Sequence, residues 1–251
     1  MIERMLCNFD PVQIARSGQC FRFEEMEGGA VRLTALGRRL TVRPAGAGRF
    51  AFSCGAQEFG ALWRGYFDLE TDYAAIGARI PENDAFLTAA YRCGEGLRIL
   101  RQDAWEALAS FIVSQNNNIP RIRASVQALS ERFGERREDG EGAYFCFPAA
   151  KALAGAEEDA LRACGLGYRA AYLLEVSRRA ADGRLDLGAM SALNDEALRA
   201  ALCALPGVGP KVAQCVMLFG FHRLAAFPVD TWIRRSLAAH YPDGFPLERY
   251  A

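Results

Sequence analysis

Short runs of alternating apolar and polar residues fill the first third of the chain, and turn-forming residues such as Gly37 separate them. The pattern changes near Phe59, and from Asn83 onward its spacing is helical almost to the end. We therefore predict an α+β protein, mostly α, with a small N-terminal antiparallel β-sheet domain at 1–96 and a helical domain at 97–251. The expected strands are 20–24, 31–36, 40–43 and 50–53.

The helical part has identifiable starts and stops. Asp103 is a plausible N-cap for a helix that places one face toward the core, with the residues Ala104, Leu108, Phe111, Ile112 and Gln115. Glycines at 134, 165, 167, 183, 207 and 209 punctuate the later helices. The charged segment 135–142 is expected to be an exposed loop.

Composition narrows the class of protein. The formal net charge of zero argues against coating nucleic acid through bulk basicity, but it allows a local DNA-binding face. No apolar segment approaches a membrane span, and the first eleven residues lack the apolar stretch of a signal peptide. The eight cysteines form no Cys-x-x-Cys pair, so we expect buried thiols in a reducing compartment. The expected location is cytoplasmic, with nucleoid association if the source is bacterial.

Lysine is scarce among the basic residues. Twenty-eight are Arg, and only Lys151 and Lys211 are Lys. Mutational pressure toward Arg would replace Lys wherever a plain positive charge suffices. A surviving Lys is then a candidate for a role that needs an amine, because an amine can lose its proton and attack carbon, whereas a guanidinium cannot.

The segment 198–220 predicts a helix-hairpin-helix. An apolar helix end containing Leu198 and Leu202 meets the turn Gly207-Val208-Gly209, and Pro210 begins a second, apolar helix. The free N–H groups of the turn and the positive end of the following helix form a site for one phosphate. Two alternatives stay open: the turn only connects two helices, or the hairpin holds DNA without chemistry.

Lys211 lies in the first turn of that second helix. If the helix is buried, desolvation and the helix dipole both disfavour the charged ammonium, as an amine nucleophile requires. The alternative is a lysine that binds phosphate or is solvated at a helix end.

Asp230 precedes another predicted helix, which we expect to bury Trp232 or Ile233 together with Leu237. Its carboxylate can cap that helix and still stay ionised. Such a carboxylate could stabilise positive charge on a sugar ring or deprotonate a nucleophile. The hairpin, the Lys and this Asp form a specific combination, although each part alone is a weak signal.

At these residues the sequence resembles the 8-oxoguanine DNA glycosylases of the helix-hairpin-helix superfamily. The matching blocks follow the family's order and spread over nearly the whole chain. They are Ser17-Gly18-Gln19-Cys20-Phe21-Arg22-Phe23, Phe111 through Ile119 with its Asn116-Asn117-Asn118 run, Gly165-Leu166-Gly167-Tyr168-Arg169-Ala170, and Leu205 through Val212 with Pro228-Val229-Asp230.

The resemblance implies a bifunctional glycosylase and lyase that removes 8-oxoguanine in base excision repair. Lys211 would attack the sugar C1′, expel the base and form a Schiff base that allows β-elimination, with assistance from Asp230. The carbonyl of Gly18 would accept the N7 hydrogen of the oxidised guanine, and Phe21 and Cys215 would belong to the base pocket.

The remaining implied roles concern the duplex. Asn116 would enter the gap left by the flipped nucleotide, Tyr168 would wedge the strands, and Arg121 and Arg169 would read the orphaned cytosine. Gly207, Val208 and Gly209 would hold a phosphate. The backbone carbonyls of Cys203, Leu205 and Val208 would hold a structural cation. The implied protein is a monomer without a cofactor, its partner is double-stranded DNA containing an oxidised guanine, and it has no membrane association.

Each of these residues also has a simpler interpretation. The Asn116 run would be a helix stop, Gly18 a turn before a strand, and Cys215 core packing. Arg121 and Arg169 would be solvated surface residues.

The sequence departs from the family at two points. The family's C-terminal helix supplies an aromatic stacking residue and an amide to the base pocket, and this sequence stops at Tyr250-Ala251, about where that helix would begin. Two explanations are considered: the chain is truncated, or another element closes the base pocket. A His common in animal relatives is replaced by Trp232.

Other enzyme classes fit less well. Endonuclease III-type and adenine glycosylases commonly bind an iron–sulfur cluster through cysteines after the Asp helix, and no cysteine follows Cys215. Methylated-base glycosylases use the Asp without a Lys nucleophile. A non-catalytic, lesion-sensing DNA-binding protein and a glycosylase for a different damaged base stay as alternatives.

Overall fold

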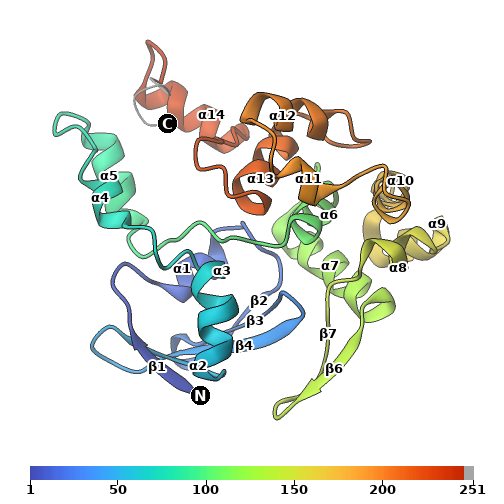
Figure 1. Ribbon diagram of the computed structural model, residues 1–251. Coiled ribbons are helices and arrows are strands. Elements are labelled where there is room, and N and C mark those ends of the chain that lie inside the picture. The colour runs from blue at the N-terminus through green and yellow to red at the C-terminus, as the bar shows by residue number, and fades with distance from the viewer. Residues whose placement is uncertain (246–251) are drawn as a thin grey trace.

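A five-stranded antiparallel sheet forms the N-terminal part of the molecule in the computed structural model, which describes residues 1–245 (Figure 1). The strand order is β1-β5-β4-β3-β2. The strands are β1 (Ile2–Met5), β2 (Phe23–Glu25), β3 (Val31–Ala35), β4 (Arg38–Pro44) and β5 (Arg49–Phe52). Four of them confirm the strands expected from sequence, with shifted ends. The sequence pattern missed β1 because its residues are exposed or half-buried and so do not alternate.

Helices cover this sheet and close its core. Ile14, Leu33, Phe52, Trp63 and Phe67 are almost fully buried. The aromatic rings meet mostly edge to face, which favours their packing. The helices of this part are α1 (Pro11–Arg16), α2 (Ala56–Glu58), η2 (Phe59–Trp63), α3 (Arg64–Tyr66), α4 (Tyr73–Gly77) and α5 (Ala85–Cys93), with a short helical turn η1 at Glu27–Gly29.

The rest of the described chain is helical apart from one hairpin, as predicted (Figure 1). Asp103 is confirmed as the N-cap of α6, because its side chain accepts a hydrogen bond from the N–H of Glu106. Eight residues of α6 are buried, so it is a central helix rather than one with a single apolar face. The helices are α6 (Ala104–Val113), α7 (Ile119–Phe133), α8 (Ala150–Ala154), α9 (Glu158–Leu161), η3 (Arg162–Leu166), α10 (Arg169–Ala181), α11 (Leu187–Met190), α12 (Asp195–Cys203), α13 (Pro210–Gly220) and α14 (Thr231–His240).

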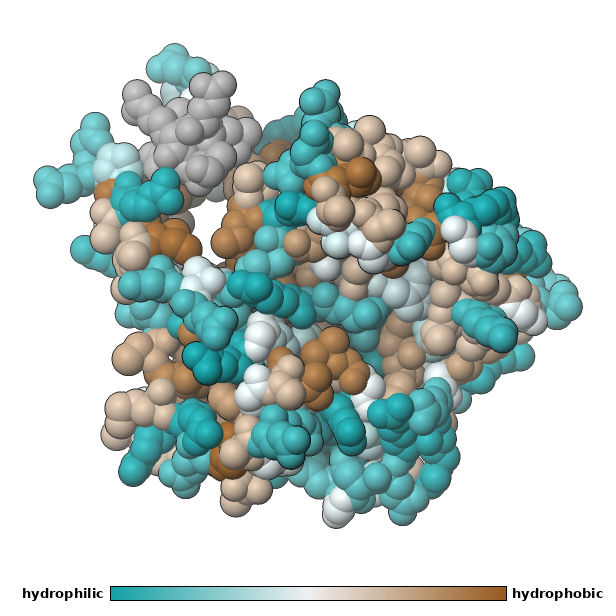
Figure 2. Space-filling model, viewed as in Figure 1, coloured by the Kyte–Doolittle hydropathy of each residue, from teal (hydrophilic) through white to brown (hydrophobic). Residues whose placement is uncertain are grey.

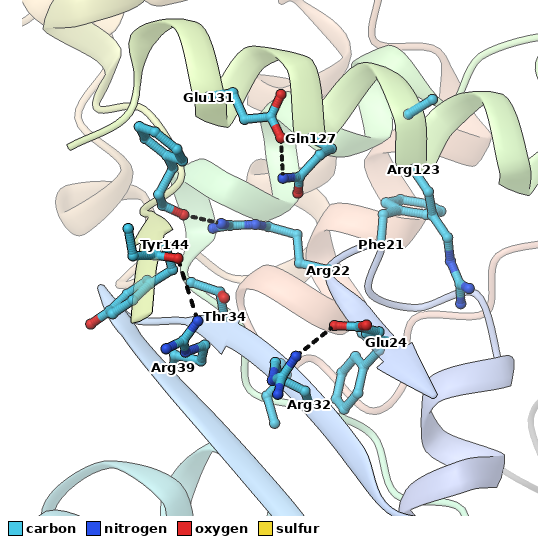
Figure 3. Close-up of a pocket in the computed structure, with 15 residues that line it drawn as sticks. Phe21, Arg22, Glu24, Arg32, Thr34, Arg39, Arg123, Gln127, Glu131 and Tyr144 are labelled. Carbon is cyan, nitrogen blue, oxygen red and sulfur yellow. Dashed lines mark hydrogen bonds and ion pairs between the residues drawn. The ribbon is translucent and has the colours of Figure 1, made fainter. Parts of the chain in front are cut away.

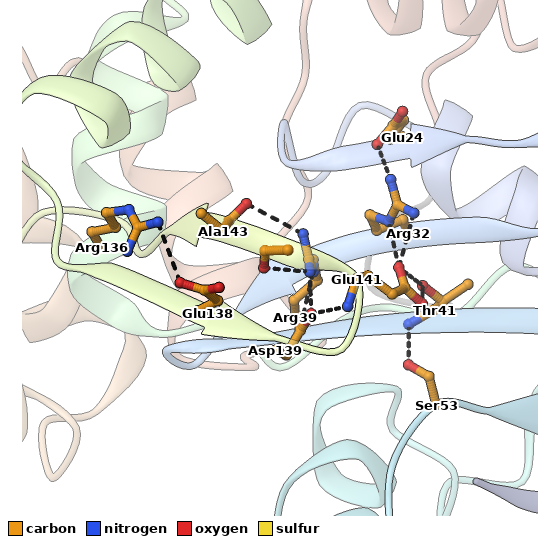
Figure 4. A network of polar contacts seen from close by, with 11 residues as sticks. Glu24, Arg32, Arg39, Thr41, Ser53, Arg136, Glu138, Asp139, Glu141 and Ala143 are labelled. Atoms are coloured by element: carbon orange, nitrogen blue, oxygen red, sulfur yellow. Dashed lines mark hydrogen bonds and ion pairs between the residues drawn. The ribbon is translucent and has the colours of Figure 1, made fainter.

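The segment expected to be an exposed charged loop is instead a two-stranded hairpin, β6 (Arg136–Asp139) and β7 (Gly142–Phe145). It lies against the N-terminal sheet, and Figure 4 shows the polar contacts that join the two. Arg32 donates to Glu141 at 2.8 Å, and the guanidinium of Arg39 pairs with the Asp139 carboxylate. The loop prediction was wrong because the partners of these charges lie about a hundred residues away, where local patterns carry no information.

The proposed division at Gly96 falls in a segment that contacts both parts of the molecule. The carbonyl of Gly96 accepts the N–H of Asp10 at 2.8 Å, and Leu100 is buried in the core of the sheet. The N–H of Gln102 donates to the carbonyl of Phe219 at the end of α13. Residues 96–102 therefore contact both the N-terminal sheet domain and the helical part of the molecule.

Hydrophilic and hydrophobic residues are interspersed on the face of the molecule that Figure 2 shows. Large apolar residues that are exposed include Met5, Leu224 and Trp232. Among residues 1–245, no helix combines the length and apolar character needed to cross a bilayer.

Candidate active site

The predicted hairpin is present as α12, a tight turn and α13. Gly207 has a φ of +73°, and a Cβ added there would lie 2.6 Å from Cδ2 of Tyr172, so both the backbone conformation and the available space require glycine. Gly209 is the N-cap of α13 and is exposed, with no heavy atom within 4 Å of an added Cβ. The backbone at the start of α13 is therefore open to a ligand, and the positive end of the helix dipole favours an anion there.

Lys211 is exposed in the first turn of α13. The burial expected from sequence was wrong for this residue, since the core covers α13 only from Val212 onward. The Nζ of Lys211 lies over the ring of Phe111, 5.7 Å from the ring centroid.

Aromatic rings lie beneath this amine. Phe111 stacks on Phe219 with centroids 5.5 Å apart and meets Phe21 edge to face at 5.7 Å. All three come from different segments, and Phe21 and Phe111 are buried. Phe21 is thus placed behind Phe111, which is the aromatic residue next to Lys211. The sequence analysis placed Phe111 only on a helix face and did not identify Phe219.

Cys215 lies one turn after Lys211, and burial raises the pKa of its thiol. The Lys211 ammonium lowers this pKa, and the Asp230 carboxylate raises it. Both residues therefore lie within electrostatic range of the Cys215 thiol.

Asp230 is confirmed as the N-cap of α14. Its Oδ1 accepts the N–H of Ile233 at 2.8 Å, and its carbonyl accepts the N–H of Arg234 at 2.9 Å. Its second carboxylate oxygen, Oδ2, is not used by the cap. A carboxylate oxygen that the cap leaves unused can accept a proton or stabilise developing positive charge.

The expected burial of α14 was wrong. Trp232 is 75% exposed, Ile233 is exposed, and Leu237 is only half-buried. None of the residues Thr231–His240 is buried. The apolar spacing of this helix resembles that of a core helix, but its first turns are exposed. Among residues 1–245, a ring contact with another helix is found at its end, where His240 stacks on Phe86 of α5 at 3.8 Å.

Gly18 lies in a rigid turn after α1. Its φ is +76°, and an added Cβ would contact Cδ1 of Ile119 at 3.4 Å. The neighbouring side chain of Gln19 is buried and donates to Ser17 Oγ and to the carbonyl of Arg98, both at 2.9 Å. Its Oε1 accepts the N–H of Leu100 at 2.8 Å. Hydrogen bonds to Arg98 and Leu100, in the segment between the two parts of the molecule, therefore hold the turn that contains Gly18 in place.

Asn116 and Arg169 belong to one cluster. Asn116 is exposed with a φ of +44°, in the turn after α6. Arg169 is only 7% exposed, and its guanidinium donates to the carbonyls of Gln115 (2.7 Å), Asn116 (2.9 Å) and Leu166 (3.2 Å). The simpler interpretation of Arg169 as a solvated surface residue was wrong. Contact with a cytosine stays a prediction, and it would require these bonds to be exchanged.

Tyr168 and Arg121 face solvent beside this cluster. Tyr168 is half-exposed, lies over the guanidinium of Arg169 at 4.6 Å, and meets Tyr172 at 6.0 Å. Because the ring of Tyr172 packs on Gly207, the wedge candidate and the hairpin turn share one surface. Arg121 is exposed at the start of α7, where its N–H donates to the side chain of the N-cap Asn118.

The predicted cation ligands in the hairpin and the predicted C-terminal element stay predictions. In the hairpin, Leu205 O accepts the N–H of Val208 at 3.1 Å and keeps a second lone pair. A structural cation at the carbonyls of Cys203, Leu205 and Val208 is compatible with that arrangement and stays a prediction. The C-terminal element expected near Tyr250 and Ala251 lies outside the described residues.

Gln214 is a polar residue within the apolar helix α13 that the sequence pattern did not single out. Its Oε1 accepts the N–H of Phe227 at 3.1 Å, three residues before Asp230. A single polar residue on an apolar helix could have signalled this contact, because such a side chain needs a partner when it is covered.

A cavity of about 520 Å³ lies elsewhere, between the sheet, α7 and β7 (Figure 3). Its arginines already have partners: Arg32 pairs with Glu24, and Arg22 donates to the carbonyl of Phe145. Neither Lys211 nor Asp230 lines it. The size of this cavity therefore does not mark the reactive site.

Two family models match the chain. Residues 2–108 match the N-terminal domain of 8-oxoguanine DNA glycosylase, and residues 109–244 match the HhH-GPD superfamily of base excision DNA repair proteins. Among curated relatives, a probable N-glycosylase/DNA lyase of Methanothermobacter thermautotrophicus is 32% identical over 196 residues, which are 70% of this chain and 61% of the relative. The N-glycosylase/DNA lyase of Saccharomyces cerevisiae is 38% identical over 174 residues, 64% of this chain and 46% of the relative. The chain thus spans about half to three-fifths of the length of these two relatives.

Solved structures agree with the fold over almost the whole chain. MBOgg1, in complex with a low affinity DNA ligand, is 35% identical with a TM-score of 0.92, and the match covers 98% of this chain and 85% of that one. The apo form of the Clostridium acetobutylicum 8-oxoguanine glycosylase/lyase is also 35% identical, with a TM-score of 0.91 and coverage of 98% and 86%. The chain therefore belongs to the 8-oxoguanine DNA glycosylase family, within the HhH-GPD superfamily of base excision DNA repair proteins.

Proposed function

We propose that this protein is a bifunctional DNA glycosylase/lyase that removes 8-oxoguanine from duplex DNA. The observation that carries the proposal is the exposed amine of Lys211 in the first turn of α13, beside an open helix N-terminus. The Asp230 carboxylate lies within electrostatic range of Cys215, one turn further along the same helix. A relative of the same fold and 35% identity has been solved with double-stranded DNA containing cytosine opposite 8-oxoguanine, which supports this choice of substrate.

The amine of Lys211 is the proposed nucleophile. It attacks C1′, the bond between C1′ and the base breaks, and the base leaves with the electron pair and acquires a proton. The amine nitrogen then loses one proton, and the C1′–O4′ bond breaks as the nitrogen lone pair forms the C=N bond of a protonated Schiff base. The ring oxygen O4′ takes up a proton as the sugar opens. The Schiff base acidifies the adjacent C2′ hydrogen, so that β-elimination breaks the bond to the 3′ oxygen. No metal or redox cofactor is needed for this balance.

Asp230 assists in one of two ways: it accepts a proton from the amine, or it stabilises positive charge that develops on the sugar. The capping bond to Ile233 orients the carboxylate for either role. The exposed position of Lys211 suits this scheme, because bound DNA supplies the desolvation that the free protein lacks.

The proposed duplex contacts surround this pair. Gly207, Val208 and Gly209 hold a phosphate at the start of α13, and Asn116 and Tyr168 occupy and wedge the gap. Arg121 and Arg169 contact the orphaned cytosine. These contacts offset the few kcal/mol that extrusion of a nucleotide costs.

Recognition of the base is proposed for the carbonyl of Gly18 and for the pocket that includes Phe21 and Cys215. The carbonyl distinguishes oxidised guanine because only the oxidised base carries a hydrogen on N7. The rigid turn around Gly18 supports this role, since a carbonyl that reads one hydrogen must be held in place. Monomeric state and a cytoplasmic location, with nucleoid association in a bacterium, are part of the same proposal.

Borohydride trapping tests the proposed function directly. With an 8-oxoguanine·cytosine duplex, wild-type protein is expected to give a covalent adduct that Lys211→Gln does not give. Lys151→Gln is the matched control, because Lys151 is the other lysine of the chain and lies on α8. Binding without any adduct at high protein excess would favour a lesion-sensing protein. An adduct only with other lesions or opposite bases would point to a glycosylase for a different base.

A further inference from the structure

The connection between α13 and α14 is ten residues long, 221–230, and contains no regular structure. Its first half is well fixed: the N–H of Arg223 donates to the carbonyl of Met217, and Ala226 is buried and donates to the carbonyl of Arg223. Its second half leads directly to Asp230. The position of the Asp230 carboxylate therefore depends on what holds residues 227–229.

One side chain of α13 holds that second half. Gln214 Oε1 accepts the N–H of Phe227 at 3.1 Å, and within residues 1–245 no other hydrogen bond joins 227–229 to α13. Pro228, the next residue, has no N–H and a fixed φ, so the short path from Phe227 to Asp230 is stiff. A constraint at Phe227 is thus transmitted to Asp230.

Gln214 also lies close to the nucleophile. It is three residues after Lys211 on the same helix, a spacing that places the two side chains on neighbouring positions of one face. The helix around it is apolar, and the adjacent residues Ala213 and Cys215 are buried. An amide in such surroundings is costly unless it is hydrogen-bonded, which favours a defined contact with Phe227.

We propose that Gln214 is a positioning residue that sets the Asp230 carboxylate relative to the Lys211 amine. The inference rests on the proposed function, because it concerns the same pair of reacting groups. The ring of Phe227 also stacks on Phe245, with centroids 5.9 Å apart, and α14 contacts Phe86 through His240 at its far end. Within residues 1–245, however, the bond to Gln214 is the one hydrogen bond that fixes the backbone of 227–229. Loss of the Gln214 acceptor would leave the N–H of Phe227 unpaired and let the segment move away from α13.

The test compares Gln214→Met, which keeps the length of the side chain and removes the acceptor, with Gln127→Met, an exposed glutamine on α7. In single-turnover excision with protein in excess, Gln214→Met is expected to be slower by about tenfold, as small displacements of reacting groups cost rate. Gln127→Met should match the wild type. Affinity for a duplex that carries a non-cleavable abasic-site analogue should change less than twofold, because Gln214 does not touch DNA in this account.

A double-mutant cycle separates positioning from general damage. If Gln214 acts through Asp230, then Gln214→Met has no further effect in protein that already carries Asp230→Asn. An equal loss of rate in both backgrounds, or a wild-type rate for Gln214→Met, overturns the inference. Should Gln214→Met fold poorly, Gln214→Glu keeps an acceptor oxygen, and its rate should still depend on Asp230 as in the wild type.

Hydrogen exchange gives a readout independent of activity. The amide of Phe227 is expected to be protected in the wild type and to exchange faster in Gln214→Met, whereas equal protection overturns the proposed bridge. If the wild type excises no base at all, the proposed function fails and the positioning role fails with it. If the wild type is active and the cycle is additive, only the inference about Gln214 fails.

Discussion

Helices α13 and α14 carry the two proposed reactive residues, but they are supported in different ways. Six residues of α13 are buried and the helix packs against α6 and α12, so the backbone of Lys211 is fixed by the core. In α14 no residue is buried, and Asp230 is held by its capping bond and by the Gln214 bridge to the preceding segment. One reactive residue thus depends on apolar packing, and the other depends on a few hydrogen bonds.

Because Lys211 and Asp230 are supported differently, we expect substitutions near each of them to have different effects. Substitutions in the core of α13 should lower the stability of the whole protein. Substitutions around α14 should change chemistry while leaving stability almost intact.

Lys211→Gln removes the proposed nucleophile from the well-supported helix. Excision of 8-oxoguanine should fall by about a thousandfold or more, because the remaining groups cannot form the covalent intermediate. Single-turnover release of the base is the measurement. Lys151→Gln should retain the wild-type rate, and an equal loss in both variants would mean that lysine substitution damages the protein generally.

Asp230→Asn leaves the helix cap in place, since Asn is as good an N-cap as Asp, but removes the negative charge. The excision rate should fall by about a hundredfold to ten-thousandfold, the range expected for a general base or charge stabiliser, with little change in thermal stability. Asp186→Asn is the matched control, because Asp186 caps α11 through the N–H of Ala189 at 2.9 Å. A large fall in melting temperature for Asp230→Asn would show that its role is structural.

Met217→Ala and Leu237→Ala compare the packing of the two helices. Met217 is buried in α13, so its truncation should lower the free energy of unfolding by about 2–5 kcal/mol. Leu237 is half-buried in α14, and its truncation should cost less than about 1 kcal/mol. Denaturant unfolding monitored by circular dichroism measures both. Equal costs would refute the proposed difference in support.

Gly207→Ala and Gly209→Ala compare two positions in the hairpin turn. Alanine at 207 meets both a φ of +73° and the ring of Tyr172, so it should lower the free energy of unfolding by about 1–3 kcal/mol. Alanine at 209 meets open space, and stability should be unchanged.

The same pair separates stability from DNA binding. Gly209→Ala places a methyl group where a phosphate is proposed to approach the backbone, so its affinity for duplex DNA should fall about fivefold, the worth of roughly one hydrogen bond. Fluorescence anisotropy at fixed salt measures this affinity. If Gly209→Ala binds duplex DNA as tightly as the wild type, no phosphate contacts the backbone at the start of α13, and this part of the proposal is wrong.

Sequence was most informative where structure follows from neighbouring residues. The cap at Asp230, the cap at Asp103 and the glycines of the hairpin turn all express local backbone chemistry, and the structure confirms them. The four expected strands are also local features. The change from alternating to helical spacing along the chain predicted the fold class, which the structure and the comparisons confirm.

Sequence failed where the outcome depends on distant partners. The hairpin at 136–145 was taken for a loop because Arg32 and Arg39, which pair with it, lie a hundred residues earlier. Trp232 has the spacing of a core residue, and only the absence of a covering helix in the described chain leaves it exposed. Lys211 was expected to be buried because its helix is, although its first turn projects from the core. The roles of the individual DNA-contacting residues stay predictions.

The central claim is that the amine of Lys211 forms a covalent intermediate with the sugar, and peptide mapping of the borohydride-trapped complex tests it most directly. The trapped protein is digested, and the modified peptide is identified by mass spectrometry. The account predicts a single modified residue, Lys211, with no modification at Lys151 or at the N-terminal amine. An adduct that maps to either of those amines, or one that persists undiminished in Lys211→Gln, would contradict it.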